Sequence, residues 1–357
     1  MRRHMGFISV GIGAALLVLS SAASGADDSR QKQWSEVVLK SLDTNLLVDD
    51  RTINTRGEFV RYRVAQVNGN WLWLVSDCGR RGWCHNRDVI QVDQAIIFWS
   101  AAIAREPESA KAYRMRGLAH HDALEYRRAI RDADAAIRID PTFALAYVDR
   151  CLAKLEKSDS RGAMADANEA IRLDPKSARA YRCRASVWQK KGQYQKAIED
   201  YDAAIRLDPN DGMLLVDRSQ CFSRQEDHDR AIADVNEAIR LEPTLTWAYL
   251  VRSKYWGRKN DGARELEDAS TAVRMDPGSP AVYLIRAFAW WHADNLTRAV
   301  ADCDEAVRLD PKDPAIHLIR AIVVANNGDI ASGLREVLFH PLVRNTPTRV
   351  KLLALQQ

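Results

Sequence analysis

The amino-acid sequence predicts a mainly α-helical fold, a superhelical solenoid of about seven helix-pair repeats preceded by a small β-barrel. The first observation is a strict 34-residue spacing of seven prolines, at positions 107, 141, 175, 209, 243, 277 and 311. A fixed period in this range is typical of a solenoid, in which no unit can bury its apolar face alone. The second is a change of pattern over residues 34–92, where short β-branched and aromatic runs alternate with turns. The third is composition, since 46% of the residues are apolar and 28% are charged, as in folded globular proteins.

Residues 1–26 are predicted to be a signal peptide. Arg2 and Arg3 precede an apolar run from Gly6 to Leu19, and a tail of small residues suits cleavage before Asp27. The apolar run is shorter than the ~20 residues that a membrane-spanning helix needs. We therefore expect an exported protein, periplasmic or extracellular, with no integral membrane span after cleavage. An uncleaved N-terminal membrane anchor is the alternative.

Residues 27–92 are predicted to form the β-barrel. Its best-marked part is NGNWLWLVSDCGRRGWCHNRDVI (68–90), in which turn sequences separate runs of strand-forming residues. This stretch resembles the end of a bacterial Src-homology-3-like (SH3-like) barrel through Trp71, Trp73, Gly82 and Trp83. Barrels of that family bind peptidoglycan or peptides, so the resemblance implies peptidoglycan as a candidate partner of residues 34–92. The simpler interpretation, which we favour, is that Trp71 and Trp83 fill the barrel core.

Residues 93–107 are predicted to be an N-terminal capping helix, and residues 108–340 the repeat array. No Pro/Gly-rich linker separates the barrel from the capping helix, so we expect the two to pack as one rigid body. Each repeat is numbered so that its proline is position 32, and Ala110 is then position 1 of the first repeat. In this numbering, position 4 is mostly aromatic, and positions 8, 20 and 27 are mostly small. Positions 4, 8 and 11 share one helix face and positions 20, 24 and 27 another, so each unit is two amphipathic helices that the proline ends. Residues 341–357 are predicted to be a C-terminal capping helix.

This pattern resembles the tetratricopeptide repeat (TPR), well over residues 110–311 and poorly over a seventh unit at 314–340. The resemblance implies a superhelix whose concave groove binds protein or peptide partners. A barrel followed by such repeats is also similar to an architecture met in exported planctomycete-type bacterial proteins. We therefore expect a non-catalytic exported scaffold. A cell-envelope adaptor that binds peptidoglycan through the SH3-like barrel is the alternative.

The same resemblance implies the groove residues, because in that family positions 2, 5, 9 and 12 of the first helix line the concave wall. In the early units the expected partner-facing residues are polar: Lys111, Arg114, His121, Arg179, Arg182 and Gln189. In the late units they are apolar: Trp247, Leu250, Leu284, Phe288, Trp291, Leu318 and Ile322. The family's carboxylate clamp needs asparagines that these positions do not carry. The apolar set is expected to bind either an outside hydrophobic peptide or the chain's own tail at 348–357.

Two polar positions recur beside the apolar stripe of each unit. Position 7 is always arginine and position 23 is aspartate in six units, which gives the pairs Arg116 and Asp132, Arg150 and Asp166, Arg184 and Asp200, Arg218 and Asp234, Arg252 and Asp268, and Arg286 and Asp302. A partly desolvated guanidinium needs a carboxylate, so we expect a structural ladder of ion pairs. Catalysis or phosphate binding by these arginines is the alternative.

No motif in the chain indicates catalysis. Nucleophile, phosphate-loop, dinucleotide and zinc signatures are all missing from the sequence, so neither an enzyme nor a cofactor is expected. Removal of residues 1–26 leaves 50 basic and 48 acidic residues, which argues against a nucleic-acid partner.

The six cysteines lack metal-ligand spacing, so no metal site is expected. Cys151 and Cys303 are expected to be small buried hydrophobes. Cys78 and Cys84 are the better disulfide candidates in an exported chain, although the sequence does not decide whether they are bonded.

Overall fold

A computed structural model describes residues 36–39, 46–48, 51–53, 62–68, 70–76 and 78–326 of the chain. The described residues belong to two compact units, of which one ends at Val251 and the other begins at Arg252. The predicted signal peptide, the second helix of the seventh repeat and the predicted C-terminal capping helix lie outside the described residues.

The first unit starts with a seven-stranded antiparallel sheet in the order β3-β2-β6-β5-β4-β1-β7. Its strands are β1 (Glu36–Leu39), β2 (Leu46–Val48), β3 (Arg51–Ile53), β4 (Tyr62–Asn68), β5 (Trp71–Ser76), β6 (Arg81–His85) and β7 (Val89–Gln91). Strands β4, β5 and β6 form a meander, with Asn68 opposite Trp71 and Trp73 opposite Trp83. A small β domain is thus present where the sequence predicts one.

The tryptophans of the sheet lie outside its apolar core. Leu72 and Leu74 are fully buried, whereas Trp71 is 41% exposed and Trp73 and Trp83 are half-buried. Successive residues of a strand point to opposite faces, so the leucines take one face and the tryptophans take the other. The expectation that Trp71 fills the core was therefore wrong, and Trp83 packs against Trp73 on the same outer face.

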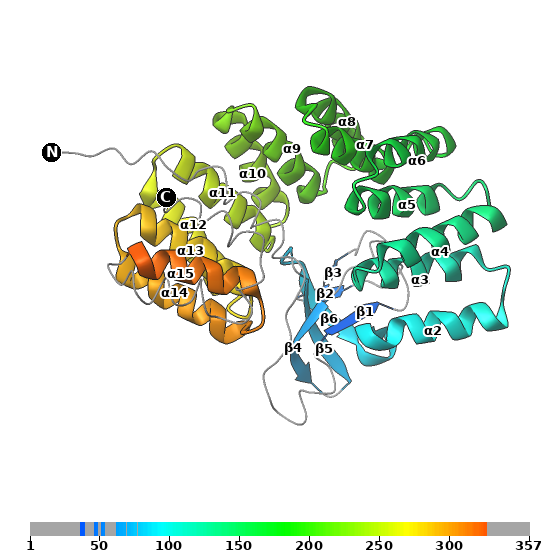
Figure 1. Ribbon diagram of the computed structural model, residues 1–357, viewed down its shortest axis with the longest axis horizontal. Helices are drawn as coiled ribbons and strands as arrows, with labels where there is room; N and C mark the ends of the chain where they lie inside the picture. Colours follow the sequence, from blue (N-terminus) through cyan, green and yellow to red (C-terminus); the bar gives the residue numbers. More distant parts are fainter. Residues whose placement is uncertain are drawn as a thin grey trace, which may run out of the picture. The chain divides into compact units, whose positions relative to one another are not determined.

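Helices follow the sheet directly and confirm the predicted solenoid (Figure 1). In the first unit they are α2 (Val92–Arg105), α3 (Ala110–Asp122), α4 (Tyr126–Ile139), α5 (Ala144–Glu156), α6 (Ser160–Leu173), α7 (Ala178–Lys190), α8 (Tyr194–Leu207), α9 (Gly212–Arg224) and α10 (His228–Leu241). Helix α11 (Thr246–Arg258) contains the division between the units. The second unit continues with α12 (Gly262–Met275), α13 (Pro280–His292), α14 (Leu296–Leu309) and α15 (Pro314–Asn326).

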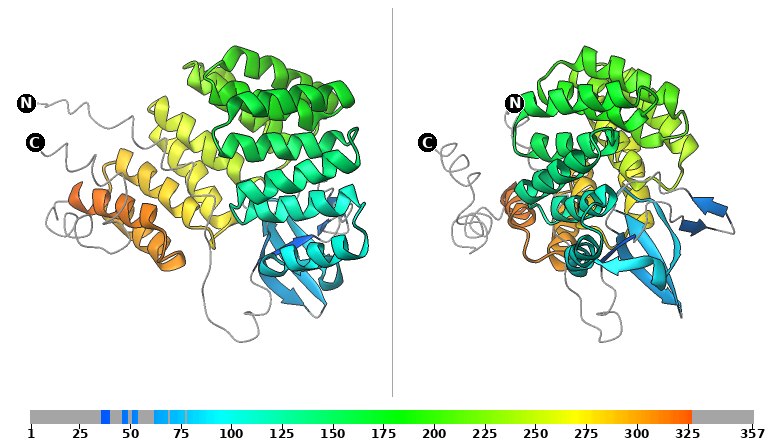
Figure 2. Two further views of the ribbon diagram at one scale, coloured as in Figure 1. Left: turned by 45° about the vertical axis from the view of Figure 1, so that its right-hand side comes forward. Right: turned by 90° about the vertical axis from the view of Figure 1, so that its right-hand side faces the viewer.

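The two helices of a repeat pack closely because small residues face each other. A Cβ on Gly117, at position 8 of the first repeat, would lie 3.4 Å from the carbonyl oxygen of Ala129 at position 20. Ala163 and Ala197, at position 20 of the next two repeats, are fully buried. Figure 2 shows the resulting helix pairs lying side by side. The backbones can approach only because neither position carries a bulky side chain.

The second unit has its own apolar core. Leu284, Ala287, Cys303 and Ile316 of α13, α14 and α15 are fully buried or nearly so and belong to one cluster. Cys303 is thus a small buried residue, as the repeat pattern predicts.

Candidate functional site

A pocket with both apolar and charged lining residues lies among the first helices of successive repeats in the unit that ends at Val251. Its volume is about 340 Å³. Its polar lining comes from Arg114 and His121 of α3, Asp149 of α5, Arg179, Arg182, Ser186 and Gln189 of α7, Tyr201 of α8 and Asp217 of α9. Five of these residues, Arg114, His121, Arg179, Arg182 and Gln189, are the predicted early groove residues. Lys111 is exposed and does not line the pocket.

Two ion pairs between neighbouring repeats organise the pocket. The Arg114 Nε donates to Asp149 Oδ2 at 2.6 Å, and the Arg182 Nε donates to Asp217 Oδ2 at 2.7 Å. Arg114 is only 3% exposed, so its charge requires this carboxylate. Both pairs join residues 35 positions apart, which are position 5 of one repeat and position 6 of the next. Asp149 and Asp217 were not predicted as site residues, although this recurring Arg–Asp spacing was visible in the sequence.

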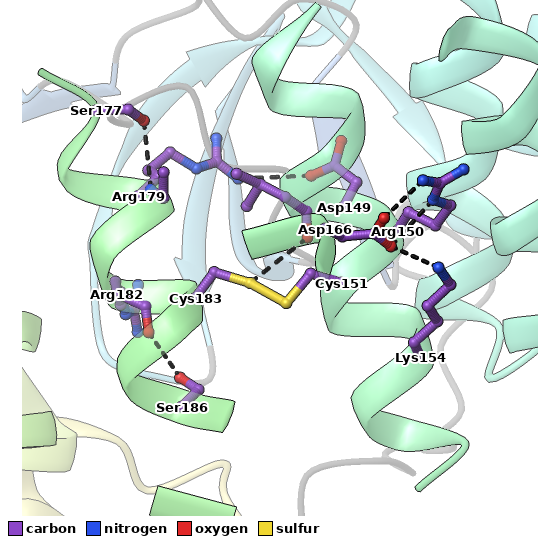
Figure 3. The surroundings of a disulfide bond; sticks show 12 residues. Asp149, Arg150, Cys151, Lys154, Asp166, Ser177, Arg179, Arg182, Cys183 and Ser186 are labelled. Atoms are coloured by element: carbon purple, nitrogen blue, oxygen red, sulfur yellow. Dashed lines mark hydrogen bonds and ion pairs between the residues drawn. A yellow bond between two sulfur atoms is a disulfide. The ribbon is translucent and has the colours of Figure 1, made fainter. Parts of the chain in front are cut away.

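Arg179 extends the first of these pairs. Its Nη2 lies 3.8 Å from Asp149 Oδ1. Figure 3 shows the two side chains pointing toward each other. The arginine side chain keeps 25% of its surface exposed, so it is more accessible than Arg114. Three arginines thus face two aspartates, and the pocket has one more positive than negative side chain.

Two further groups are held neutral. Burial lowers the pKa of His121, against the influence of Glu156 and Asp149, and its Nε2 is buried with no hydrogen-bond partner. The Tyr201 hydroxyl donates to Gln189 Oε1 at 3.0 Å, and burial raises the tyrosine pKa well above its usual value. The pocket therefore combines charged donors with an imidazole nitrogen that has a free hydrogen-bonding valence.

A disulfide lies in the wall of the pocket. Cys183 of α7 lines the pocket and is bonded to Cys151 of α5, with the two Cα atoms 7.0 Å apart (Figure 3). The expectation that Cys151 is a plain buried hydrophobe was wrong, because it occupies a site facing Cys183 on the neighbouring first helix. Cys78 and Cys84, the pair favoured from the sequence, are not joined in a disulfide, and burial raises the pKa of Cys84 to about 11.

The predicted late groove is not an open apolar surface. Leu250, Leu284 and Leu318 are buried, and Leu284 belongs to the core cluster of its unit. Phe288 and Trp291 stack on each other at 6.2 Å between ring centroids and pack against the core of their unit. Trp247 and Ile322 are half-buried. The prediction that these residues form one exposed patch was wrong for the three leucines, and the predicted tail at 348–357 lies outside the described residues.

The six predicted Arg–Asp pairs are all two-point contacts. In each, the arginine Nε and Nη2 donate to the two carboxylate oxygens, for example Arg184 to Asp200 at 2.8 and 2.7 Å. This contact raises the pKa of Arg184. Arg218 also donates from Nη1 to Asp202 of the preceding repeat at 2.6 Å, so the pairs link repeats as well as helices.

The outer face of the sheet is a second, aromatic candidate site. Trp71 meets His85 edge to face at 5.4 Å, and Trp73 meets Trp83 in the same way at 5.3 Å. Of the rings in this row, that of Trp71 is exposed to solvent.

Among the residues that the structure describes, no group of three or more His, Cys, Asp or Glu side chains is placed to hold a metal ion. None of the described helices has the length and apolar character to cross a membrane.

Comparisons with known proteins identify the repeats. Family models of the tetratricopeptide repeat match residues 178–211 in one case and residues 91–142 and 257–314 in another. These segments are therefore tetratricopeptide repeats. Among curated proteins, none matches this sequence.

Solved structures show the same fold. Yeast Tom70 aligns with a TM-score of 0.59 and 18% identity over 74% of this chain and 57% of that one. A tetratricopeptide repeat protein from Parabacteroides merdae aligns with a TM-score of 0.55 and 15% identity, over 69% of this chain and 98% of that one. PilW, a type IV pilus biogenesis factor, aligns with a TM-score of 0.51 and 15% identity, over 59% and 98%. The chain matches little more than half of the Tom70 structure, and at these identities the likeness shows the fold alone.

Proposed function

We propose that this protein is a non-catalytic scaffold that binds an acidic segment of a protein or peptide in the pocket of α3, α5 and α7. The observation that carries the proposal is the excess of arginine over aspartate among the lining side chains. Arg114 and Arg182 each have a carboxylate partner within 2.7 Å, and the Arg179 guanidinium lies 3.8 Å from Asp149 with 25% of its side-chain surface exposed. A carboxylate of the partner would accept hydrogen bonds from the exposed part of the planar Arg179 guanidinium.

Peptides that differ only in charge test this function. We would titrate the full chain with three short fluorescein-labelled peptides that carry glutamate, glutamine or lysine at the same central positions, and measure anisotropy at low and high salt. The glutamate peptide is expected to bind best. Arg179→Ala should weaken its binding about tenfold or more, because a hydrogen bond to a charged group contributes about 1.5–3 kcal/mol.

Arg206→Ala is the matched control, since Arg206 is an exposed arginine of α8 outside the pocket lining. It should leave the affinity unchanged. Equal binding of all three peptides, or equal loss in both variants, contradicts the assignment.

Export of the protein is part of the proposal. The Cys151–Cys183 disulfide supports it, because disulfides persist in oxidising compartments and are rare in the cytosol. The predicted signal at residues 1–26 would direct the chain there. Expression in a bacterial host should yield a periplasmic protein that begins at Asp27, and a cytosolic protein with its N-terminus intact would contradict export.

A cell-envelope adaptor is the second candidate, favoured by the aromatic row on the outer face of the sheet. A row of aromatic rings on one face, with Trp71 exposed, suits stacking against sugar rings or peptide side chains. Purified peptidoglycan should then retain the full chain in a sedimentation assay and lose it with Trp71→Ala. Trp188→Ala, in the repeats, is the control. Equal sedimentation of all three proteins rules out this use of the sheet.

A further inference from the structure

The turn between β5 and β6 reaches the far end of its own unit. Arg80 in this turn is 5% exposed. Its Nη2 donates to Asp211 Oδ1 at 2.9 Å and its Nε donates to Glu242 Oε2 at 3.1 Å. These partners lie 131 and 162 residues further along the chain, at the start of α9 and the end of α10.

The two carboxylates are themselves held in place. Glu242 Oε1 accepts from the backbone N–H of Gly212 at 2.9 Å, and Asp211 Oδ1 accepts from the backbone N–H of Met213 at 3.1 Å. Both amides belong to the first turn of α9, where backbone N–H groups have no partner within the helix. Asp211 and Glu242 thus form a binding site for the Arg80 guanidinium. The backbone of α9 holds this site in place.

The backbone of the turn makes a second contact with the same region. The N–H of Trp247 donates to the carbonyl oxygen of Cys78 at 3.2 Å. Gly79 has a φ of +96°, and a Cβ there would lie 2.4 Å from the backbone nitrogen of Thr246. Only glycine satisfies both the backbone conformation and this close approach.

The opposite end of the sheet is attached to the start of the helical array. Strand β7 runs directly into α2, and Ile90, Ala95 and Ala119 form a small apolar cluster that joins β7, α2 and α3. The sheet is therefore attached to the repeats at both α2–α3 and α9–α11 (Figures 1 and 2). The helices from α3 to α10 form an arc between these two attachments.

We propose that the turn at residues 78–80 is a latch, in which Arg80 seated between Asp211 and Glu242 closes the arc from α3 to α10 and holds its curvature. A repeat array has contacts only between neighbouring units, so small rotations at each interface accumulate along it. One contact that joins the two ends removes that freedom. Opening the latch would let the first helices α3, α5 and α7 change their spacing. The inference concerns the protein without a ligand, so it does not depend on the proposed pocket function.

Arg80→Gln tests the latch, with Arg87→Gln as the control because Arg87 is an exposed arginine of the same sheet domain. Amide hydrogen exchange at single-residue resolution would follow the N–H of Trp247. We expect Arg80→Gln to speed its exchange at least tenfold, while amides within α5 to α8 keep their wild-type rates. Arg87→Gln should change neither. An unchanged Trp247 amide in Arg80→Gln would overturn the latch.

A distance measurement follows the arc itself. Spin labels at Ile97→Cys in α2 and Arg224→Cys in α9, both exposed sites, would be compared in a Cys78→Ser background. Arg80→Gln should broaden the distance distribution relative to Arg87→Gln, and superimposable distributions would show that the arc is held without Arg80.

A lysine variant keeps the test decisive if Arg80→Gln does not fold, as judged by circular dichroism. Arg80→Lys retains the charge and loses the two-point geometry. It should speed exchange of the Trp247 amide by a smaller factor, and exchange at the wild-type rate in a folded Arg80→Lys variant contradicts the proposal.

Discussion

At the scale of single residues, buried aspartates pair with arginines of the same repeat and stabilise the packing of its two helices. Asp200 is buried and is held at both oxygens by Arg184. We predict that Asp200→Ala lowers the free energy of unfolding by about 3 kcal/mol, because it leaves the half-buried guanidinium of Arg184 without its carboxylate partner. Urea denaturation followed by circular dichroism measures the difference.

Glu199→Ala is the control, since Glu199 neighbours Asp200 on α8 and is exposed. It should change stability by less than about 0.5 kcal/mol, as most surface substitutions do. A loss for Asp200→Ala as small as this would show that the Arg–Asp pair contributes little to stability.

A hydrogen-bonded pair of one histidine and one glutamate makes the stability of the protein depend on pH. Glu265 occupies position 20, which is alanine in most repeats, and is only 4% exposed. Its Oε1 lies 2.8 Å from His292 Nδ1, and this hydrogen bond raises the pKa of His292. A histidine whose pKa is raised by folding adds stability that is fully present below its unfolded pKa of about 6.5 and is lost as the pH rises through its folded pKa.

We therefore expect the wild-type protein to have a higher melting temperature than His292→Gln at pH 5.5. This difference in melting temperature should become smaller toward pH 8.5. Differential scanning calorimetry across this range measures it. A gap that stays constant or widens with pH would contradict a charged pair.

At the scale of elements, the turn between the two helices of a repeat has one unusual backbone position. Position 15 is left-handed in successive repeats: Leu124, Ser158, Gly192, Glu226, Asn260 and Asp294 have φ between 56° and 72°. Only one of these residues is glycine, although left-handed backbone costs other residues about 1–2 kcal/mol. The helix packing on either side imposes this conformation on whatever residue is present.

Leu124→Gly should therefore raise stability by about 0.5–1 kcal/mol, since the relief of strain exceeds the added entropy of the unfolded chain. Leu124 is half exposed, so little packing is lost. Gly192→Ala should lower stability by a similar amount, because nothing crowds its Cβ position and only the backbone conformation opposes the change. Urea midpoints of the two variants would move in opposite directions, and movement in the same direction would refute the argument.

At the scale of the whole molecule, one covalent link joins two neighbouring repeats. The Cys151–Cys183 bond closes a loop between residues 32 positions apart, which limits the unfolded chain. Its removal in Cys183→Ser is expected to lower the free energy of unfolding by about 2–4 kcal/mol. Because contacts in a repeat array are local, faster amide exchange should concentrate in α5 to α8.

Thiol counting supplies an independent check. Alkylation of the unfolded, unreduced protein should modify Cys78, Cys84, Cys221 and Cys303 and spare the other two cysteines. Modification of all six would show that the bond does not form.

The amino-acid sequence was sufficient to predict the two main features that recur in each repeat, the helix pair and its Arg–Asp pair. The 34-residue period predicted the helix pairs, and the Arg–Asp pairs could be read from it because both partners lie 16 residues apart in a single helix pair. Local packing of two helices depends on residue size and spacing, which the sequence states directly. Three arginines of the pocket were predicted through the resemblance to the tetratricopeptide repeat, which implies the positions that line the groove.

The tertiary structure decided which neighbour each side chain meets. Arg114 finds its aspartate on the next repeat, Cys151 pairs with Cys183 and not with another thiol, and Arg80 reaches across 131 residues to Asp211. Periodicity assigns a position within a repeat but leaves the rotation between repeats open, and that rotation selects these partners. The sheet follows the same rule, because a shift of one residue exchanges the faces of Trp71 and Leu72. Only the packed molecule, in which burial and long-range contacts act together, determines that choice.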